Sequence, residues 1–154
     1  MYMELVSIII VNWNTGSLLA KCIASLEALP EKSSIRRVII VDNASTDDSL
    51  EQARNVANTD LYVFLPEQQN LGFAKANNLG FEYNKNDGGE HDHILLLNPD
   101  TQVHSGAIES MIDALTKNPK IGIVGPKLLE TNGDVQPSVR TFPTLGIFVL
   151  LFLK

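Results

Sequence analysis

The chain has little cysteine and few basic residues, and both shortages narrow its possible functions. Its 154 residues include one cysteine, Cys22, so an internal disulfide framework and a cysteine-rich zinc cluster are excluded. Twelve lysine and arginine residues face 18 acidic residues, which gives a formal charge of −6. Because a net acidic surface repels a polyphosphate backbone, we expect no nucleic acid as a partner. This charge still permits one small anion at a local site.

The motifs of several common enzyme classes are also missing. The turn after the first apolar run holds one glycine, Gly16, and not G-x-G-x-x-G, which argues against a nicotinamide or flavin dehydrogenase. Neither G-x-x-x-x-G-K-[ST] nor G-x-S-x-G occurs, which excludes a P-loop nucleotide hydrolase and the nucleophile elbow of the α/β-hydrolases. The last ten residues, 145–154, are strongly apolar but too few to cross a bilayer as a helix, which needs about 20 residues.

What the sequence does contain is an alternation of apolar runs and helical patterns. Apolar runs without polar alternation are typical of parallel strands that are covered on both faces. Four such runs occur at Leu5–Val11, Val38–Val41, Leu61–Leu65 and Ile94–Leu97, and Ile121–Val124 is a candidate fifth strand. Strands that alternate with helices predict an α/β fold with a mainly parallel sheet.

Apolar residues at three- and four-residue spacing predict a helix after each of the four strands. The first helix can be capped by Thr15 or Ser17, and the second begins near Ser45–Thr46. The third follows Gly72, and the fourth follows Ser105 and ends before Asn118–Pro119. Cys22 lies on the apolar face of the first helix, so we interpret it as a buried small hydrophobe and not as a reactive thiol.

Polar residues follow every predicted strand. These segments are Asn12–Gly16, Asp42–Asp47, Gln69–Phe73 and Asn98–Asp100. Ligands of open α/β sheets bind beyond the carboxyl ends of the strands, where the strand order reverses. If the strand order is 3-2-1-4, all four segments face one polar crevice.

Two acids in these segments have both a chemical and a purely structural interpretation. Asp100 follows a buried strand and the rigid Pro99, and it could bind Mg²⁺ or Mn²⁺ together with phosphate oxygens and water. It could instead cap the next turn beside Thr101. Asp42 could accept hydrogen bonds from a base N–H or from ribose hydroxyls, or it could form an Asx-turn with Ser45.

Taken together, the four segments resemble the nucleotide-sugar-binding half of an inverting family 2 glycosyltransferase with the GT-A fold. The resemblance rests on VSIIIVNWN (6–14), VIIVDNASTDDS (38–49), QNLGFAKANNLG (69–80) and LLLNPDT (95–101). A later stretch, 125–144, is similar to the branch that includes bacterial rhamnosyltransferases. The resemblance implies a Rossmann-like three-layer α/β/α architecture.

The resemblance also implies roles for particular residues. Val11, Asn12, Asn14, Asp42 and Ser45 would hold the base and ribose of a UDP- or dTDP-sugar. The third motif would line the nucleotide and diphosphate through Asn70, Gly72 and Asn78. Asn98-Pro99-Asp100 stands where the family has its Asp-x-Asp type motif, which makes Asp100 the metal ligand and Asn98 a hydrogen-bond partner.

The implied reaction transfers a sugar, with rhamnose suggested by the branch, to a saccharide or lipid-linked acceptor in bacterial cell-surface polysaccharide synthesis. We expect residues 1–127 to form the nucleotide-sugar-binding domain and 128–154 to begin an acceptor-side segment. No catalytic residue is assigned, because the family's general base lies in a downstream acidic motif, which we expect beyond Lys154. We therefore expect a truncated chain with weak or no activity.

An alternative of another class stays open at this point. The chain could be a non-catalytic nucleotide-binding or assembly module that forms a homodimer through the apolar segment 145–153. A single cysteine fits a reducing compartment, so we expect a cytoplasmic protein, with a peripheral position at the inner face of the membrane as a second option.

Overall fold

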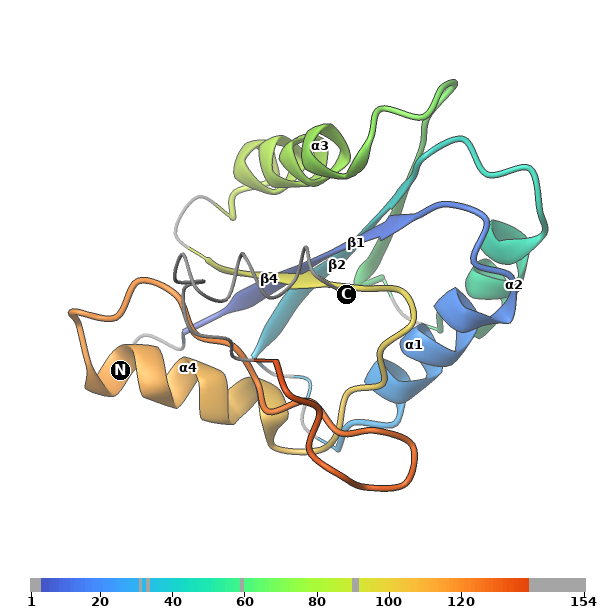
Figure 1. Cartoon of the computed structure of the whole chain (residues 1–154). Coiled ribbons are helices and arrows are strands. Elements are labelled where there is room, and N and C mark those ends of the chain that lie inside the picture. Colours follow the sequence, from blue (N-terminus) through green and yellow to red (C-terminus); the bar gives the residue numbers. More distant parts are fainter. Residues whose placement is uncertain (1–3, 31, 33, 59, 90–91, 139–154) are drawn as a thin grey trace, which may run out of the picture.

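The computed structural model describes residues 4–30, 32, 34–58, 60–89 and 92–138 (Figure 1). Strands and helices alternate in these ranges as β1 (Val6–Asn12), α1 (Ser17–Glu27), β2 (Ile35–Asp42), α2 (Ser49–Val56), β3 (Tyr62–Pro66), α3 (Phe73–Asn86), β4 (His93–Leu97) and α4 (Ala107–Lys117). The strands pair in parallel in the order β3-β2-β1-β4. This arrangement confirms the predicted α/β class and the predicted strand order.

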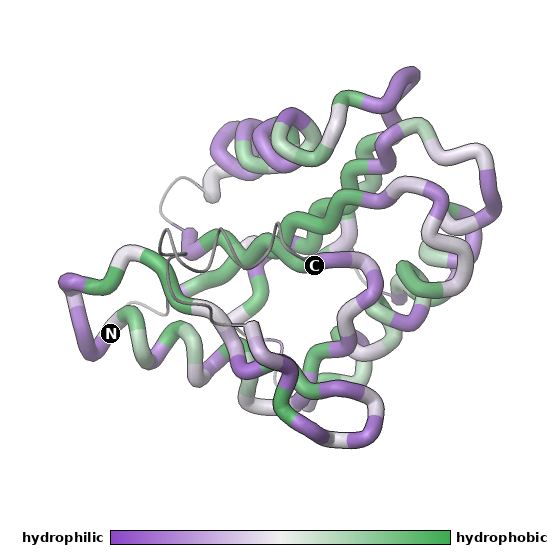
Figure 2. Tube along the Cα trace, viewed as in Figure 1, coloured by the Kyte–Doolittle hydropathy of each residue, from purple (hydrophilic) through white to green (hydrophobic). Residues whose placement is uncertain are grey.

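Helices cover both faces of the sheet, which confirms the predicted three-layer architecture (Figure 1). Successive residues of β1 point to opposite faces. Ile8 and Ile10 pack in a cluster with residues of α1, α2 and α4, whereas Ile9 packs in a second cluster with residues of α3. Because both faces are buried, β1 is apolar along nearly its whole length, and the strands form the apolar centre of the molecule (Figure 2).

The α3 helix approaches the sheet closely at Gly80. A β-carbon added to Gly80 would lie 2.6 Å from Cγ2 of Ile9 and 3.4 Å from Cγ2 of Val41. These two residues belong to β1 and β2, the central strands of the sheet. A residue without a side chain is therefore required where this helix crosses them.

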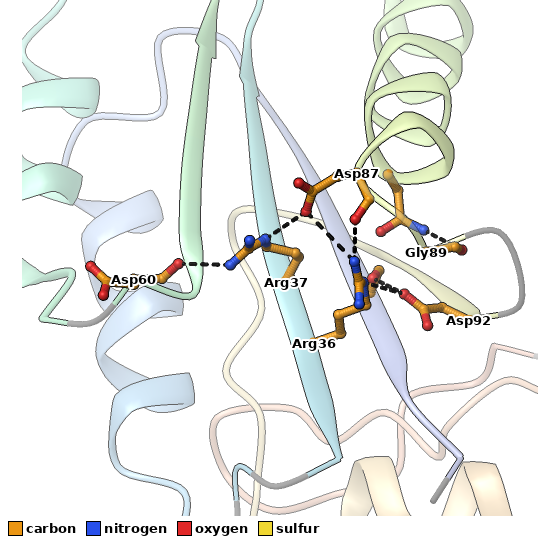
Figure 3. A network of polar contacts seen from close by, with 8 residues as sticks. Arg36, Arg37, Asp60, Asp87, Gly89 and Asp92 are labelled. Atoms are coloured by element: carbon orange, nitrogen blue, oxygen red, sulfur yellow. Dashed lines mark hydrogen bonds and ion pairs between the residues drawn. The ribbon is translucent and has the colours of Figure 1, made fainter. Parts of the chain in front are cut away.

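Charged residues join the end of α3 to the amino-terminal ends of β2 and β4 (Figure 3). Nε of Arg37 lies 2.8 Å from Oδ2 of Asp87, and Nε of Arg36 lies 3.2 Å from Oδ2 of Asp92. Arg36 also donates a hydrogen bond to the backbone carbonyl of Asp87. We call these four residues the amino-edge clasp, because they lie at the opposite edge of the sheet from the predicted ligand crevice.

The predicted fifth strand at Ile121–Val124 is wrong. This segment is irregular in the structure, and the side chains of Ile121 and Ile123 are 42% and 91% exposed. An apolar run indicates burial, but a strand also needs a neighbour to accept and donate its backbone hydrogen bonds. Within residues 118–138 the only pairing is an isolated antiparallel bridge between Leu129 and Val135.

The predicted side-chain cap of α1, by Thr15 or Ser17, and the predicted start of α2 are also wrong. No side chain caps α1, whose N-cap is Gly16, because the Thr15 hydroxyl donates to Asn12 instead. The α2 helix begins at Ser49 and not near Ser45–Thr46. The predicted boundary between residues 127 and 128 falls in irregular chain, and the proposed dimer segment, 145–153, lies outside the described residues. None of the helices in the described ranges has the length and hydropathy to cross a membrane.

Candidate functional site

The carboxyl edge of the sheet is organised around Asn12, the last residue of β1, whose side chain is fully buried. Its amide nitrogen lies 2.7 Å from Oδ1 of Asp42, the last residue of β2. The same nitrogen lies 2.9 Å from Oγ of Ser49 and 3.1 Å from Oγ of Ser45. Its oxygen accepts a hydrogen bond of 2.5 Å from the Thr15 hydroxyl. The ends of β1 and β2 and the start of α2 are thereby held together.

Asp42 is 5% exposed and closes a local turn with Ser45, as one of its two interpretations expected, through a bond that spans three residues. Its Oδ1 accepts a hydrogen bond of 2.6 Å from the Ser45 hydroxyl, and its Oδ2 accepts one of 3.2 Å from the Ser45 backbone N–H. A carboxylate oxygen can accept more than one hydrogen bond, so Oδ2 keeps acceptor capacity for a ligand. The turn fixes the orientation of that oxygen.

Asn14 joins the loop that follows β1 to the loop that follows β2. Its backbone N–H donates to Oγ of Ser45 over 3.0 Å, and its side-chain oxygen accepts from the backbone N–H of Thr46 over 2.7 Å. Asn14 has φ of 51°, a left-handed conformation that asparagine tolerates better than most residues. Beside it, the N–H of Gly16 donates to Oδ2 of Asp47 over 2.8 Å. Asn14 therefore uses its backbone N–H and its side-chain oxygen within the protein.

A second pair of asparagines links β2 to the segment that precedes α3. Nδ2 of Asn43 donates to Oδ1 of Asn70 over 2.8 Å, and Oδ1 of Asn43 accepts from the N–H of Leu71 over 2.7 Å. The N–H of Gly72 also donates to Oδ1 of Asn70, over 2.8 Å. Gly72 is the N-cap of α3 and has φ of 79°, which favours glycine. Asn70 and Gly72 are thus fixed relative to Asp42 through its neighbour Asn43.

Asp100 lies in a tight turn immediately after β4. The carbonyl of Asn98 accepts hydrogen bonds from the backbone N–H of Thr101 over 3.2 Å and from its hydroxyl over 2.6 Å. Pro99 and Asp100 occupy the two central positions of this turn. The side chain of Asp100 is exposed. Asp100 therefore does not point into the packed interior.

Two groups near this edge have shifted pKa values. Burial, together with the negative charge of Asp100, raises the pKa of the Cys22 thiol to about 12. Cys22 is fully buried on α1, which confirms its interpretation as a core residue and leaves the thiol protonated at neutral pH. A hydrogen bond from the Ser49 hydroxyl is the main cause that lowers the pKa of Asp47.

The structure joins most, but not all, of the predicted site residues through hydrogen bonds. Asn12, Asn14, Asp42 and Ser45 form one network, and Asn70 and Gly72 join it through Asn43. The carbonyl of Asn98 contacts α1 and not this network, and Asp100 is exposed beside it. Asn78 is exposed on α3, and Val11 packs in the α3-side cluster.

Sequence reasoning missed the roles of three residues in the network. Asn43 follows a strand end, like the residues that were singled out, so its position was an available signal. Ser49 gave no comparable signal, because only the fold brings it to Asn12. Thr15 gave none either, because its hydroxyl could equally have capped the following helix.

A divalent cation fits this edge only if a ligand helps to bind it. Among the described residues there is no group of three or more His, Cys, Asp or Glu side chains that could hold a metal. Mg²⁺ often uses one or two carboxylates and takes its remaining oxygens from phosphates and water. A single exposed carboxylate, Asp100, therefore fits a metal that is shared with a diphosphate and not a metal held by protein alone.

An open parallel sheet with helices on both faces and a polar carboxyl edge places the chain among the α/β proteins, whose ligands bind beyond the strand ends. A family model described as "Glycosyl transferase family 2" matches residues 7–145. The chain therefore belongs to glycosyl transferase family 2, which confirms the resemblance seen in the sequence.

Two kinds of curated relatives match this chain. It is 31% identical over 149 residues to an N-acetylglucosaminyl-diphospho-decaprenol L-rhamnosyltransferase of Mycobacterium tuberculosis, covering 92% of this chain and 47% of the relative. It is 25% identical over 140 residues to a poly-beta-1,6-N-acetyl-D-glucosamine synthase of Staphylococcus aureus, covering 90% of this chain and 32% of the relative. The chain thus spans less than half the length of these relatives.

Solved structures of glycosyltransferases share the fold. The mannosyltransferase PcManGT of Pyrobaculum calidifontis, determined in complex with GDP-Man and Mn²⁺, matches with a TM-score of 0.64 and 20% identity over 79% of this chain and 35% of its own. TarS 1–349 of S. aureus matches with a TM-score of 0.60 and 17% identity over 74% and 33%. These similarities confirm the predicted Rossmann-like GT-A fold.

Proposed function

We propose that this chain provides the nucleotide-sugar-binding part of an inverting glycosyltransferase that uses a UDP- or dTDP-sugar. We further propose L-rhamnose as the sugar and a saccharide or lipid-linked acceptor. The 31% identity to the M. tuberculosis rhamnosyltransferase supports both proposals. The similarity of this chain to the S. aureus poly-beta-1,6-N-acetyl-D-glucosamine synthase supports a role in the synthesis of surface polysaccharides.

The observation that carries this proposal is the pair of hydrogen-bonded strand ends at Asn12 and Asp42. Their side chains are buried and held by Ser45 and Ser49, so the free acceptor capacity of Asp42 has a fixed direction. An acceptor at this position of a nucleotide-binding α/β fold suits a base N–H or a ribose hydroxyl. Asp100 is exposed after β4, which pairs in parallel with β1. This position suits the diphosphate end of the same ligand.

In the proposed reaction an acceptor hydroxyl attacks the anomeric carbon from the side opposite the nucleoside diphosphate, which leaves with the bonding electron pair. A general base outside the residues assigned here takes the hydroxyl proton. A divalent cation would supply positive charge that offsets the negative charge developing on this leaving group. Asp100 would hold that cation, and Asp42 would orient the nucleoside. The protein thus contributes mainly by positioning the donor.

Nucleotide titration with and without Mn²⁺, followed by thermal unfolding, tests the proposal. A ligand at one hundred times its Kd adds about 2.7 kcal/mol of stability, which corresponds to about 5–10 °C in Tm for a chain of this size. We expect UDP or dTDP to raise Tm and Mn²⁺ to enlarge the increase. Asp100→Ala should remove the Mn²⁺-dependent part and leave the metal-free part unchanged.

Asp113→Ala is the matched control, because Asp113 is an exposed acid on α4 whose partner is Lys117, 2.6 Å away. It should behave like the unchanged protein in every titration. A protein that responds to GDP but to neither pyrimidine nucleotide would contradict the proposed donor class. A Mn²⁺ effect that survives in Asp100→Ala would contradict the proposed metal ligand.

A further inference from the structure

We propose that Ser25 on α1 is a positioning residue that sets the place of Asp100 for metal-dependent nucleotide binding. This inference rests on the proposed function, because it assumes that Asp100 contacts a metal bound to a diphosphate. Among the described residues, Ser25 contacts neither the hydrogen-bond network around Asn12 and Asp42 nor the side chain of Asp100. The inference therefore gives Ser25 an indirect role at the carboxyl edge.

The Ser25 hydroxyl bridges α1 and the loop that carries Asp100. It donates a hydrogen bond of 2.7 Å to the carbonyl of Cys22, one turn earlier in the helix. It accepts a hydrogen bond of 2.9 Å from the backbone N–H of Val103, three residues after Asp100. A hydroxyl has one hydrogen to donate, and the hydrogen of Ser25 points toward the carbonyl of Cys22. A lone pair of the same oxygen is then available to the N–H of Val103.

A second contact between the same two segments lies on the other side of Asp100. Sγ of Cys22 lies 3.8 Å from the carbonyl of Asn98, to which it donates a weak hydrogen bond. That carbonyl also closes the turn through Thr101. The loop is therefore attached to α1 both before and after Asp100, and the Val103 side chain packs against the core cluster of that helix.

Asp100 itself contributes nothing to this attachment. Its exposed carboxylate forms no hydrogen bond with the rest of the described residues, so its position depends on the backbone that carries it. A site with a single protein carboxylate gains affinity when that group is already in place before the metal arrives. Of the two attachments, the Ser25 bond is the stronger, because sulfur is a weak donor.

The test measures the Kd of UDP and dTDP by titration calorimetry with and without Mn²⁺. We expect Ser25→Ala to weaken the Mn²⁺-dependent gain in affinity about two- to tenfold, the effect expected from loss of one hydrogen bond. Metal-free affinity should not change, and Ser25→Thr should restore the gain because it keeps the hydroxyl. In the Asp100→Ala background, Ser25→Ala should have no further effect.

Ser110→Ala is the matched control, because Ser110 forms the same kind of bond to a carbonyl in the preceding turn, that of Gly106, on α4. It should leave all affinities unchanged. Hydrogen exchange of the Val103 amide, which needs no nucleotide, should be faster in Ser25→Ala than in Ser110→Ala.

Several results would overturn this role for Ser25. They are unchanged Val103 exchange, an equal loss of affinity with and without Mn²⁺, or an effect that persists without Asp100. If the unchanged protein shows no Mn²⁺-dependent gain, the proposed function fails as well. If that gain is present and depends on Asp100 but not on Ser25, only the present inference fails.

Discussion

At the scale of single residues, the site depends on a buried polar side chain in a position where the strand could have continued its apolar run. A buried amide costs free energy unless its donors and acceptor are satisfied. Asn12 meets this condition, because its nitrogen and its oxygen both have partners. Its side-chain N–H also donates a hydrogen bond to the buried carboxylate of Asp42.

We predict that Asn12→Ala lowers the free energy of unfolding by about 1–3 kcal/mol, the cost of leaving a buried polar group without its partner. It should also weaken binding of UDP or dTDP in the absence of metal, because Asp42 loses a contact that orients it. Urea unfolding and calorimetry measure the two effects. Asn78→Ala, at an exposed position of α3, should change stability by less than about 0.5 kcal/mol. Equal stabilities of the two variants would contradict the role given to Asn12.

At the scale of elements, the sequence predicts strands and helices well where burial alone decides them. The four strands, the start of α3 and the extent of α4 follow from apolar spacing, because the sheet has helices on both faces. The prediction fails at Ile121–Val124, where apolar residues are exposed and have no strand to pair with.

The predicted cap of α1 and the predicted start of α2 fail for a different physical reason. Thr15 and Ser45 are good caps in isolation, but their hydroxyls donate to Asn12 and Asp42. The candidate site shows the same limit. Its residue types and strand-end positions were predictable, whereas the contacts of Ser49 and Ser25 join segments far apart in sequence. Only the fold reveals contacts of this kind.

The packing of α3 on the sheet leads to a prediction at this scale. Gly80→Ala should destabilise the protein by about 1–3 kcal/mol, because the new methyl group would overlap the side chain of Ile9. Gly122→Ala adds the same group where no atom lies within 4 Å, and Gly122 has no positive φ. Thermal unfolding of both variants tests the prediction. A Gly80→Ala protein as stable as Gly122→Ala would show that α3 does not need this close approach.

At the scale of the whole molecule, the two edges of the sheet are held together by different kinds of contact. The amino-edge clasp holds α3 to β2 and to the start of β4 through two arginines and two acids (Figure 3). The carboxyl edge is held instead by neutral amides and hydroxyls around Asp42. Structural ion pairs lie at the amino edge, and the carboxyl edge is the one at which we propose that the nucleoside diphosphate and its metal bind.

A further ion pair lies at the end of α1, and it makes the stability of the fold depend on pH. Nζ of Lys32 lies 2.7 Å from Oε2 of Glu27. Burial by itself raises the pKa of Glu27, but contacts with Lys32 and with Tyr62 of β3 outweigh this effect, so the pKa lies below its usual value of 4.5. Burial and the same contact with Glu27 raise the pKa of Tyr62, so its hydroxyl stays protonated at neutral pH.

A lowered pKa in the folded state means that the ionised form of Glu27 stabilises the fold. This contribution is present in full above the unfolded pKa and is lost as the pH falls through the folded pKa. We predict that Glu27→Gln is less stable than the unchanged protein by about 0.5–1 kcal/mol at pH 7, and that the difference shrinks as the pH falls below the usual value of 4.5. Urea unfolding between pH 3 and about pH 8 measures it, with Glu82→Gln, exposed on α3, as the control. A difference that stays constant or grows in acid would mean that the contribution of Glu27 to stability does not depend on its charge.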